Sequence, residues 1–113
     1  MKRGEVWQVN LDPTIGAEIK KIRPCVIVNR DALAKLPLKI IVPLTEWHPR
    51  FEAAPWHVPV EGTPENGLSK KSSADTFQVR SISEERLIRS IGNVSDLVMQ
   101  RIGEGLALCL ALV

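Results

Sequence analysis

Residues 5–11 read Glu-Val-Trp-Gln-Val-Asn-Leu, and apolar and polar side chains alternate along this stretch, which is typical of a β protein. Trp7, Val9 and Leu11 share one face, which predicts a half-buried β-strand. Residues 24–29, Pro-Cys-Val-Ile-Val-Asn, form a continuous β-branched run. Such a run predicts a second strand that is buried on both faces or nearly so.

Further strands and one helix are expected along the chain. Asp31 would cap a single helical turn ending at Leu36, and Pro43 places a break or a sheet edge near the end of its strand. Ser95 is a good N-cap for a C-terminal helix. We expect strands over residues 39–45, 56–60, 76–82 and 86–94, loops over 14–22, 46–55 and 61–67, and a helix whose apolar stripe is Val98, Ile102, Leu106, Cys109 and Val113. The predicted fold is mainly β (α+β), a small, curved β-barrel with one C-terminal helix.

Composition is that of an ordinary globular protein. The 113 residues are 44% hydrophobic and 25% charged, and they fit a single domain over residues 1–113. No apolar run approaches the ~18 residues of a membrane span, and the N-terminus lacks the apolar core of a signal peptide. We therefore expect a cytoplasmic protein without a membrane partner.

The cysteines and histidines do not predict a metal site. Cys25 and Cys109 lie in apolar surroundings, which is typical of small buried side chains. A zinc site would need both cysteines to converge with His48 and His57, although no pair among the four has ligand spacing. The same two histidines have no motif that supports a two-histidine ribonuclease mechanism. We expect no metal and no cofactor.

Positive charge is concentrated in the N-terminal half. Residues 1–50 carry nine Lys/Arg and five Asp/Glu, whereas residues 51–113 carry six and eight. Within residues 20–39 there are six basic residues and one acid, Asp31. A local basic zone on a nearly neutral chain suits a polyanionic partner, although solvated surface charges would give the same pattern.

Short motifs occur in a fixed order: Arg3-Gly4-Glu5-Val6-Trp7, Leu11-Asp12-Pro13-Thr14, Gly16 with Glu18, Arg23-Pro24, Pro43-Leu44-Thr45, and Gln78-Val79-Arg80-Ser81-Ile82. Each is weak alone, but the ordered set resembles the MazF/PemK toxins, the sequence-specific endoribonucleases (mRNA interferases) of type II toxin–antitoxin systems. The resemblance covers essentially the whole chain. It implies an SH3-like barrel of the CcdB/PemK type that forms homodimers.

The resemblance also implies a reaction, the metal-free cleavage of single-stranded RNA. The substrate's 2′-hydroxyl attacks the adjacent phosphate and leaves a 2′,3′-cyclic phosphate and a 5′-hydroxyl. Arg23 matches the family's catalytic arginine, whose permanent charge suits the developing phosphorane. Thr45 matches the catalytic Thr or Ser, whose hydroxyl would hold a phosphate oxygen or the 2′-hydroxyl. From the residues alone, Arg23 paired with an acid such as Glu18, and Thr45 as a strand-ending residue, remain open.

Further positions are expected to contact RNA. Three match positions near the family's RNA groove, two belong to the basic zone, and one is a tryptophan in a polar loop, where it would stack on bases. Gln78 and Arg80 should share one face of strand 76–82. The candidate RNA-binding residues are Glu18, Lys20, Lys21, Trp47, Gln78 and Arg80.

The chain departs from some relatives at two positions. Phe77 stands where some carry an acid, with Asp75 two residues earlier, and Ala17 stands where others carry histidine. Catalytic schemes built on that acid or that histidine are therefore not carried over. We expect the other two tryptophans, Trp7 and Trp56, to be structural.

The resemblance implies partners as well. An antitoxin with a disordered, acidic C-terminal segment would cover the basic zone, and DNA would be contacted only through that antitoxin. A homodimer would use the helix stripe together with Ile88 and Ile91. The rival interpretations are a gyrase-poisoning toxin on the same barrel and an inactive module that only binds antitoxin or RNA.

Overall fold

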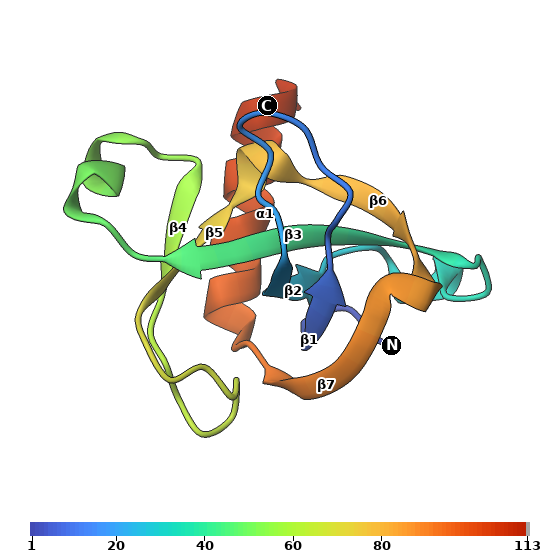
Figure 1. The fold of residues 1–113 in the computed structure, drawn as a ribbon. Helices are drawn as coiled ribbons and strands as arrows, with labels where there is room; N and C mark the ends of the chain where they lie inside the picture. The colour runs from blue at the N-terminus through green and yellow to red at the C-terminus, as the bar shows by residue number, and fades with distance from the viewer. Residues whose placement is uncertain (113) are drawn as a thin grey trace.

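The computed structural model describes residues 1–112 as a seven-stranded antiparallel sheet and one helix (Figure 1). The strands are β1 (Glu5–Asn10), β2 (Ile22–Ile27), β3 (Leu38–Glu46), β4 (His57–Val60), β5 (Ser72–Asp75), β6 (Arg80–Ser83) and β7 (Leu87–Asn93), and the helix is α1 (Asp96–Leu110). Short 3₁₀ turns are η1 (Asp31–Leu33), η2 (Pro49–Ala53), η3 (Thr76–Gln78) and η4 (Glu84–Arg86). The mainly β class with a C-terminal helix is confirmed, although the sheet of residues 1–112 does not close.

The longest strand, β3, organises the sheet and crosses the middle of Figure 1. The strand order is β4-β5-β3-β2-β1-β7, and β6 also pairs with β3. Along one edge of β3, β6 pairs as far as Ile41 and β5 takes over at Leu44. The break expected at Pro43 is therefore a change of partner, because the strand itself continues through this residue and pairs it with Cys25 of β2.

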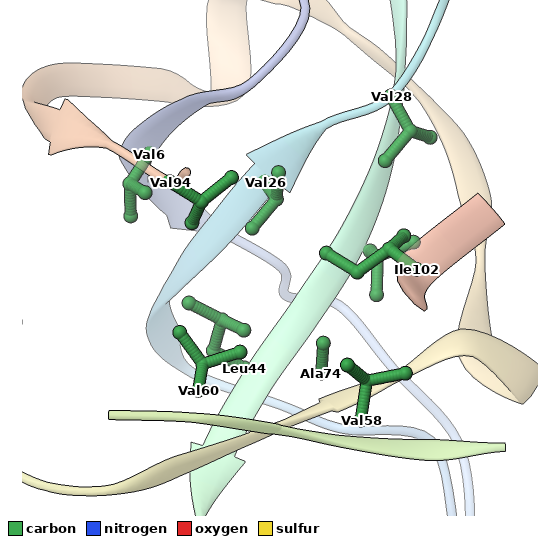
Figure 2. Close-up of a cluster of buried hydrophobic side chains, with 10 residues drawn as sticks. Val6, Val26, Val28, Leu44, Val58, Val60, Ala74, Val94 and Ile102 are labelled. Carbon is green, nitrogen blue, oxygen red and sulfur yellow. The ribbon is translucent and has the colours of Figure 1, made fainter. Parts of the chain in front are cut away.

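The core has two parts, and β1 contributes to both. Val6 belongs to the first cluster, which lies between the sheet and α1 (Figure 2). Val9 and Leu11 belong to the second, against which Trp7 packs as expected. The first cluster is Val6, Val26, Val28, Val42, Leu44, Val58, Val60, Ala74, Val94 and Ile102.

The strand expected over residues 76–82 is wrong in its first half. Asp75 Oδ1 accepts a hydrogen bond from Phe77 N (3.2 Å), which turns the chain into η3 before β6 begins at Arg80. Phe77 is 70% exposed instead of facing a core. β5 directly precedes this turn and has no counterpart among the expected strands, because its residues, Ser-Ser-Ala-Asp, show no apolar alternation.

The C-terminal helix begins as expected, since Ser95 Oγ accepts a hydrogen bond from Val98 N (3.2 Å). Its stripe packs on the chain's own core: Ile102 is buried, and Val98 and Leu106 pack on the first cluster. The expectation that this stripe serves a partner is therefore wrong, and Ile91 is likewise turned inward. Val113 lies outside the described residues. No helix of residues 1–112 has the length and apolarity to cross a membrane.

Trp56 is also placed differently from expectation. Its carbonyl accepts from Thr76 N (3.1 Å) and Thr76 Oγ1 (2.7 Å), so the backbone is fixed at the start of β4. The indole itself is 37% exposed and lines an apolar surface pocket with Phe77 and Leu108. The ring is therefore a surface feature and not part of the core.

Candidate functional site

The sheet of β4, β5 and β3 has one apolar face and one polar face. Val58, Ala74 and Leu44 point into the first core cluster. Because side chains alternate along a strand, their sequence neighbours point to the opposite face. Cross-strand register pairs His57 with Asp75, and Ser73 with Thr45. The polar face therefore carries four groups from three strands: His57, Asp75, Ser73 and Thr45.

A groove of about 640 Å³ lies over this polar face. Side chains of β2, of the segment from Glu46 to Phe51 and of η3 complete its walls, so it draws on stretches that are far apart in the sequence. Its lining residues are Ile19, Arg23, Thr45, Glu46, Trp47, His48, Arg50, Phe51, His57, Asp75 and Gln78.

Both catalytic candidates line the groove. Register between β2 and β3 pairs Cys25 with Pro43, and two residues further along it brings Arg23 alongside Thr45. Arg23 Nε donates to Lys20 O (3.2 Å), and this arginine takes part in none of the ion pairs of residues 1–112. The alternative pairing with Glu18 is therefore wrong. The Thr45 hydroxyl makes no hydrogen bond within residues 1–112, which leaves it available to a ligand.

His57 is held firmly in this groove. Its Nδ1 lies 2.7 Å from Ser73 Oγ, and its ring stacks on Phe51 with centroids 3.9 Å apart and an interplanar angle of 4°. Burial lowers the pKa of His57, the Asp75 carboxylate acts in the opposite direction, and the Arg50 guanidinium adds to the lowering. The net pKa lies below the ordinary value for histidine, so the imidazole is neutral at neutral pH.

The segment from Glu46 to Phe51 supplies an aromatic wall. Trp47 meets Phe51 edge to face, with ring centroids 5.7 Å apart, and Lys71 Nζ lies 4.7 Å from the centre of the Trp47 ring. His48 caps η2, because its Nδ1 accepts from Arg50 N (3.1 Å). The Trp47 ring therefore lies in the groove with an ammonium on one face, an arrangement compatible with base stacking.

Gln78 has a different placement from the one expected. Its Oε1 accepts from Ile19 N (2.7 Å) and its Nε2 donates to Ala17 O (3.3 Å), so the amide fastens the loop between β1 and β2. Gln78 lies in η3, so it does not share a strand face with Arg80. Arg80 Nη1 donates to Leu11 O (3.2 Å), and Arg80 lines a neighbouring pocket. Both side chains hold the loop in place at the edge of the groove.

The remaining candidates lie on that same loop. Glu18 Oε1 accepts from Ile15 N (2.6 Å) and lines the neighbouring pocket. Lys20 and Lys21 are exposed beside Arg23 and do not line the groove itself. Lys21 has a left-handed backbone (φ 73°), and its carbonyl accepts from Leu11 N (3.0 Å). The basic zone therefore adjoins the groove without forming its floor.

Sequence reasoning missed part of this site. From the sequence, His57 is considered only as a possible zinc ligand and as half of a histidine pair, and Ser73 is not singled out. Phe51, which stacks on His57, was likewise not singled out. For Ser73, the available signal is the pattern in residues 72–75, where three polar residues surround a single alanine beside a predicted strand.

The cysteines and histidines do not assemble into a ligand set. Cys25 lies in the second core cluster, where burial raises the pKa of its thiol to about 12. Cys109 Sγ lies 3.6 Å from Thr76 Oγ1. Within residues 1–112, no group of three or more His, Cys, Asp or Glu side chains has the arrangement of a metal site.

Within residues 1–112, an arginine without an ion pair, a hydroxyl without a hydrogen bond and an imidazole line one groove above the polar face of a small antiparallel β protein. Residues 2–110 match the family model described as the PemK-like, MazF-like toxin of type II toxin-antitoxin system. The chain belongs to this family.

Relatives with established names support the assignment. The chain is 36% identical to Endoribonuclease MazF9 of Mycobacterium tuberculosis, over 99% of this chain and 98% of that protein. It is 28% identical to Endoribonuclease EndoA of Bacillus subtilis, over 100% and 97%.

Among solved structures, MazF from Deinococcus radiodurans has a TM-score of 0.82 at 18% identity, covering 98% and 96% of the two chains. An endoribonuclease from a Mycobacterial species, in complex with its cognate antitoxin, has a TM-score of 0.77 at 21% identity, covering 100% and 97%. At these identities the structures establish the fold.

Proposed function

We propose that this chain is the toxin of a type II toxin–antitoxin pair and cleaves single-stranded RNA in the cytoplasm, acting as a single toxin domain over residues 1–113. The substrate's 2′-hydroxyl attacks the adjacent phosphate, and the products are a 2′,3′-cyclic phosphate and a 5′-hydroxyl. This chemistry needs alignment of the attacking oxygen and stabilisation of charge on the phosphorane, with no metal or organic cofactor.

Arg23 and Thr45 have complementary roles in this scheme. The guanidinium presents a planar pair of donors to the phosphate oxygens and is worth most at the phosphorane, where negative charge is greatest. The Thr45 hydroxyl, which has no partner within residues 1–112, holds a phosphate oxygen or the attacking 2′-hydroxyl. Trp47 stacks on a neighbouring base.

One observation carries the proposal: Arg23 and Thr45 line the same groove from adjacent strands. Within residues 1–112, Arg23 makes no ion pair and the Thr45 hydroxyl makes no hydrogen bond, so both are available to a ligand. The test is cleavage of a long labelled single-stranded RNA in excess EDTA, followed by analysis of the ends. We expect wild-type cleavage with cyclic phosphate ends, at least ~10²-fold loss for Arg23→Ala, and partial rescue of Thr45→Val by Thr45→Ser.

Arg89→Ala is the matched control, because Arg89 is exposed on β7 and makes no side-chain hydrogen bond within residues 1–112. Folded Arg23→Ala and Thr45→Val proteins that cleave at the wild-type rate would refute the proposal. A strict requirement for a divalent ion would refute it as well. Absence of cleavage by the folded wild type would favour a non-catalytic toxin, since a protein that only binds gyrase needs neither side chain.

The cognate antitoxin is the second proposed partner, and DNA is reached only through it. An acidic, disordered segment would bind the exposed zone of Lys20 and Lys21 beside Arg23, where its carboxylates take the place of RNA phosphates. We expect Lys20→Glu/Lys21→Glu to weaken RNA and antitoxin together and to flatten the salt dependence of RNA binding. Loss of RNA affinity with unchanged antitoxin affinity would show that the two ligands use different surfaces.

A homodimer is the third element of the proposal, with a surface different from the one expected. Phe77, Trp56 and Leu108 border an apolar pocket of about 580 Å³ next to the helix end, where Leu110 and Leu112 are also exposed. We expect light scattering to report a dimer of the 12.6 kDa chain and Leu108→Glu to dissociate it. Leu97→Glu at the other end of α1 is the control, and a monomeric wild type would contradict the prediction.

A further inference from the structure

The proposed reaction removes a proton from the 2′-hydroxyl, and the groove offers few groups that accept one. The Arg23 guanidinium is permanently protonated, and the Thr45 hydroxyl is not basic at neutral pH. His48 is exposed, and its Nδ1 already accepts from Arg50 N. Asp75 is 7% exposed, and its Oδ1 accepts from Phe77 N. The Glu46 carboxylate is exposed and pairs with Lys70 at 3.8 Å. His57 is the one neutral imidazole fixed on the polar face that Thr45 shares.

The hydrogen bond to Ser73 prepares this imidazole for proton transfer. When Nδ1–H donates to Ser73 Oγ, the lone pair of the ring lies on Nε2. Nε2 makes no hydrogen bond within residues 1–112. Ser73 is fully buried, and Phe51 covers one face of the ring, so the orientation of the imidazole is fixed from two directions.

We propose that His57 is the general base of the RNA cleavage and that Ser73 is the positioning residue that fixes its tautomer. This inference rests on the proposed function. Nε2 takes the 2′-hydroxyl proton as the bond between that oxygen and phosphorus forms. The bond between phosphorus and the 5′-oxygen then breaks, and the 5′-oxygen takes a proton from solvent water. The imidazolium returns its proton to solvent, so one proton is taken from solvent and one is given back, and the enzyme ends in its starting state.

The charges around the ring suit both halves of this cycle. Burial and the Arg50 guanidinium disfavour an imidazolium in the resting enzyme, which keeps Nε2 free, whereas the Asp75 carboxylate stabilises the imidazolium once the proton has moved. The titratable and charged groups that line the two pockets beside His57 are Asp75 of β5, Glu46 of β3, Arg50 and His48 of the loop, Arg23 of β2, and Arg101 and Glu104 of α1.

The decisive experiment measures kcat and kcat/KM against pH for an RNA whose cleavage site has been mapped with the wild type. We expect the wild-type profile to fall at acid pH, below the ordinary histidine pKa of about 6.5, as His57 becomes protonated. His57→Gln should lower kcat by about 10²-fold or more and remove this acidic limb. The limb should persist in His48→Gln. An acidic limb that survives in His57→Gln would overturn the assignment.

A second substrate separates the base from an acid. Sulfur in place of the bridging 5′-oxygen leaves without a proton, so it rescues variants that lack a general acid. We expect the defect of His57→Gln to persist with this substrate. Rescue to near the wild-type rate would show that His57 protonates the leaving group, and the assignment as base would be wrong.

Two further measurements exclude a structural explanation. An RNA with a 2′-deoxy sugar at the cleavage site binds without being cut, and its affinity for His57→Gln should stay within about twofold of wild type. Ser73→Ala leaves the imidazole in place without its partner, and we expect kcat to fall about tenfold with KM little changed. If His57→Gln loses affinity for the 2′-deoxy RNA as severely as it loses rate, His57 acts in binding and the inference fails. If wild type itself does not cut RNA in EDTA, the proposed function fails first.

Discussion

Gln78 provides a sharp test of how the loop between β1 and β2 is held. Its amide makes two hydrogen bonds to that loop, one from Ile19 N at 2.7 Å and one to Ala17 O at 3.3 Å. Gln78→Met keeps the length of the side chain and removes both polar atoms. We expect the loop to open more often in this variant, because the Ile19 amide has no replacement acceptor while the loop stays closed.

The size of the effect follows from the two bonds. A short, partly buried bond contributes about 1 kcal/mol net, and a long, exposed one contributes a few tenths. Their loss therefore raises the population of the open loop by about 5- to 10-fold. Arg23 Nε donates to Lys20 O in the same loop, and kcat/KM should stay within about twofold of wild type, because the closed loop remains the major form.

The assay is amide hydrogen exchange at Ile19, measured residue by residue by NMR. Exchange at this amide should accelerate about 5- to 10-fold while the amides of the central strands stay protected. Gln100→Met is the control, because Gln100 is exposed on α1 and its one side-chain hydrogen bond within residues 1–112 is to Glu104. Unchanged exchange at Ile19, or equal acceleration across the whole sheet, would refute the role of Gln78 as the fastener of the loop.

Two stability predictions follow from buried contacts elsewhere. Lys39 is 1% exposed, and its ammonium donates to three backbone carbonyls and pairs with Glu84 at 3.1 Å, so Lys39→Met should cost about 2–4 kcal/mol in urea unfolding. Glu84→Gln should cost under ~1 kcal/mol, because that carboxylate is 41% exposed; equal costs would refute the reasoning. A Cβ on Gly105 would lie 2.8 Å from Thr76 Oγ1, so Gly105→Ala should destabilise by about 1–3 kcal/mol. Gly103 has open space, so Gly103→Ala should stabilise by up to ~1 kcal/mol, and the two melting temperatures should move in opposite directions.

Much of the fold was accessible from sequence, for a physical reason. β1, β2 and α1 bury apolar side chains with a regular period, and burial is the strongest force that sequence patterns record. Ser95 was recognisable as a helix start because an N-cap is a local interaction that needs only its own neighbours. Arg23 and Thr45 were recognisable because Arg23 directly precedes Pro24 and Thr45 ends the Pro43-Leu44-Thr45 motif, in an order that the family shares.

The rest of the site depends on contacts that no local pattern records. Gln78 looked like a strand residue because it alternates with apolar neighbours, but the Asp75 carboxylate captures Phe77 N and bends the chain at that point. Trp56 looked like a core residue because it is large and begins the strand expected over residues 56–60. In the structure its carbonyl accepts a hydrogen bond from Thr76, whereas its ring lies at the surface. Hydrogen bonds fix the backbone at both places, and such bonds leave no trace in periodicity.

β5 explains why the site and the least predictable strand coincide. Its four residues contribute only Ala74 to the core clusters, so its own sequence provides little reason to be a strand. Its neighbours supply that reason, since β3 and β4 pair with it on both sides and carry the apolar residues that hold the layer together. A strand held by its partners is free to place Ser73 and Asp75 on the polar face of the sheet, between β3 and β4. There Ser73 holds His57 more precisely than a residue of an exposed loop would, although β5 lacks the apolar pattern by which strands are normally recognised.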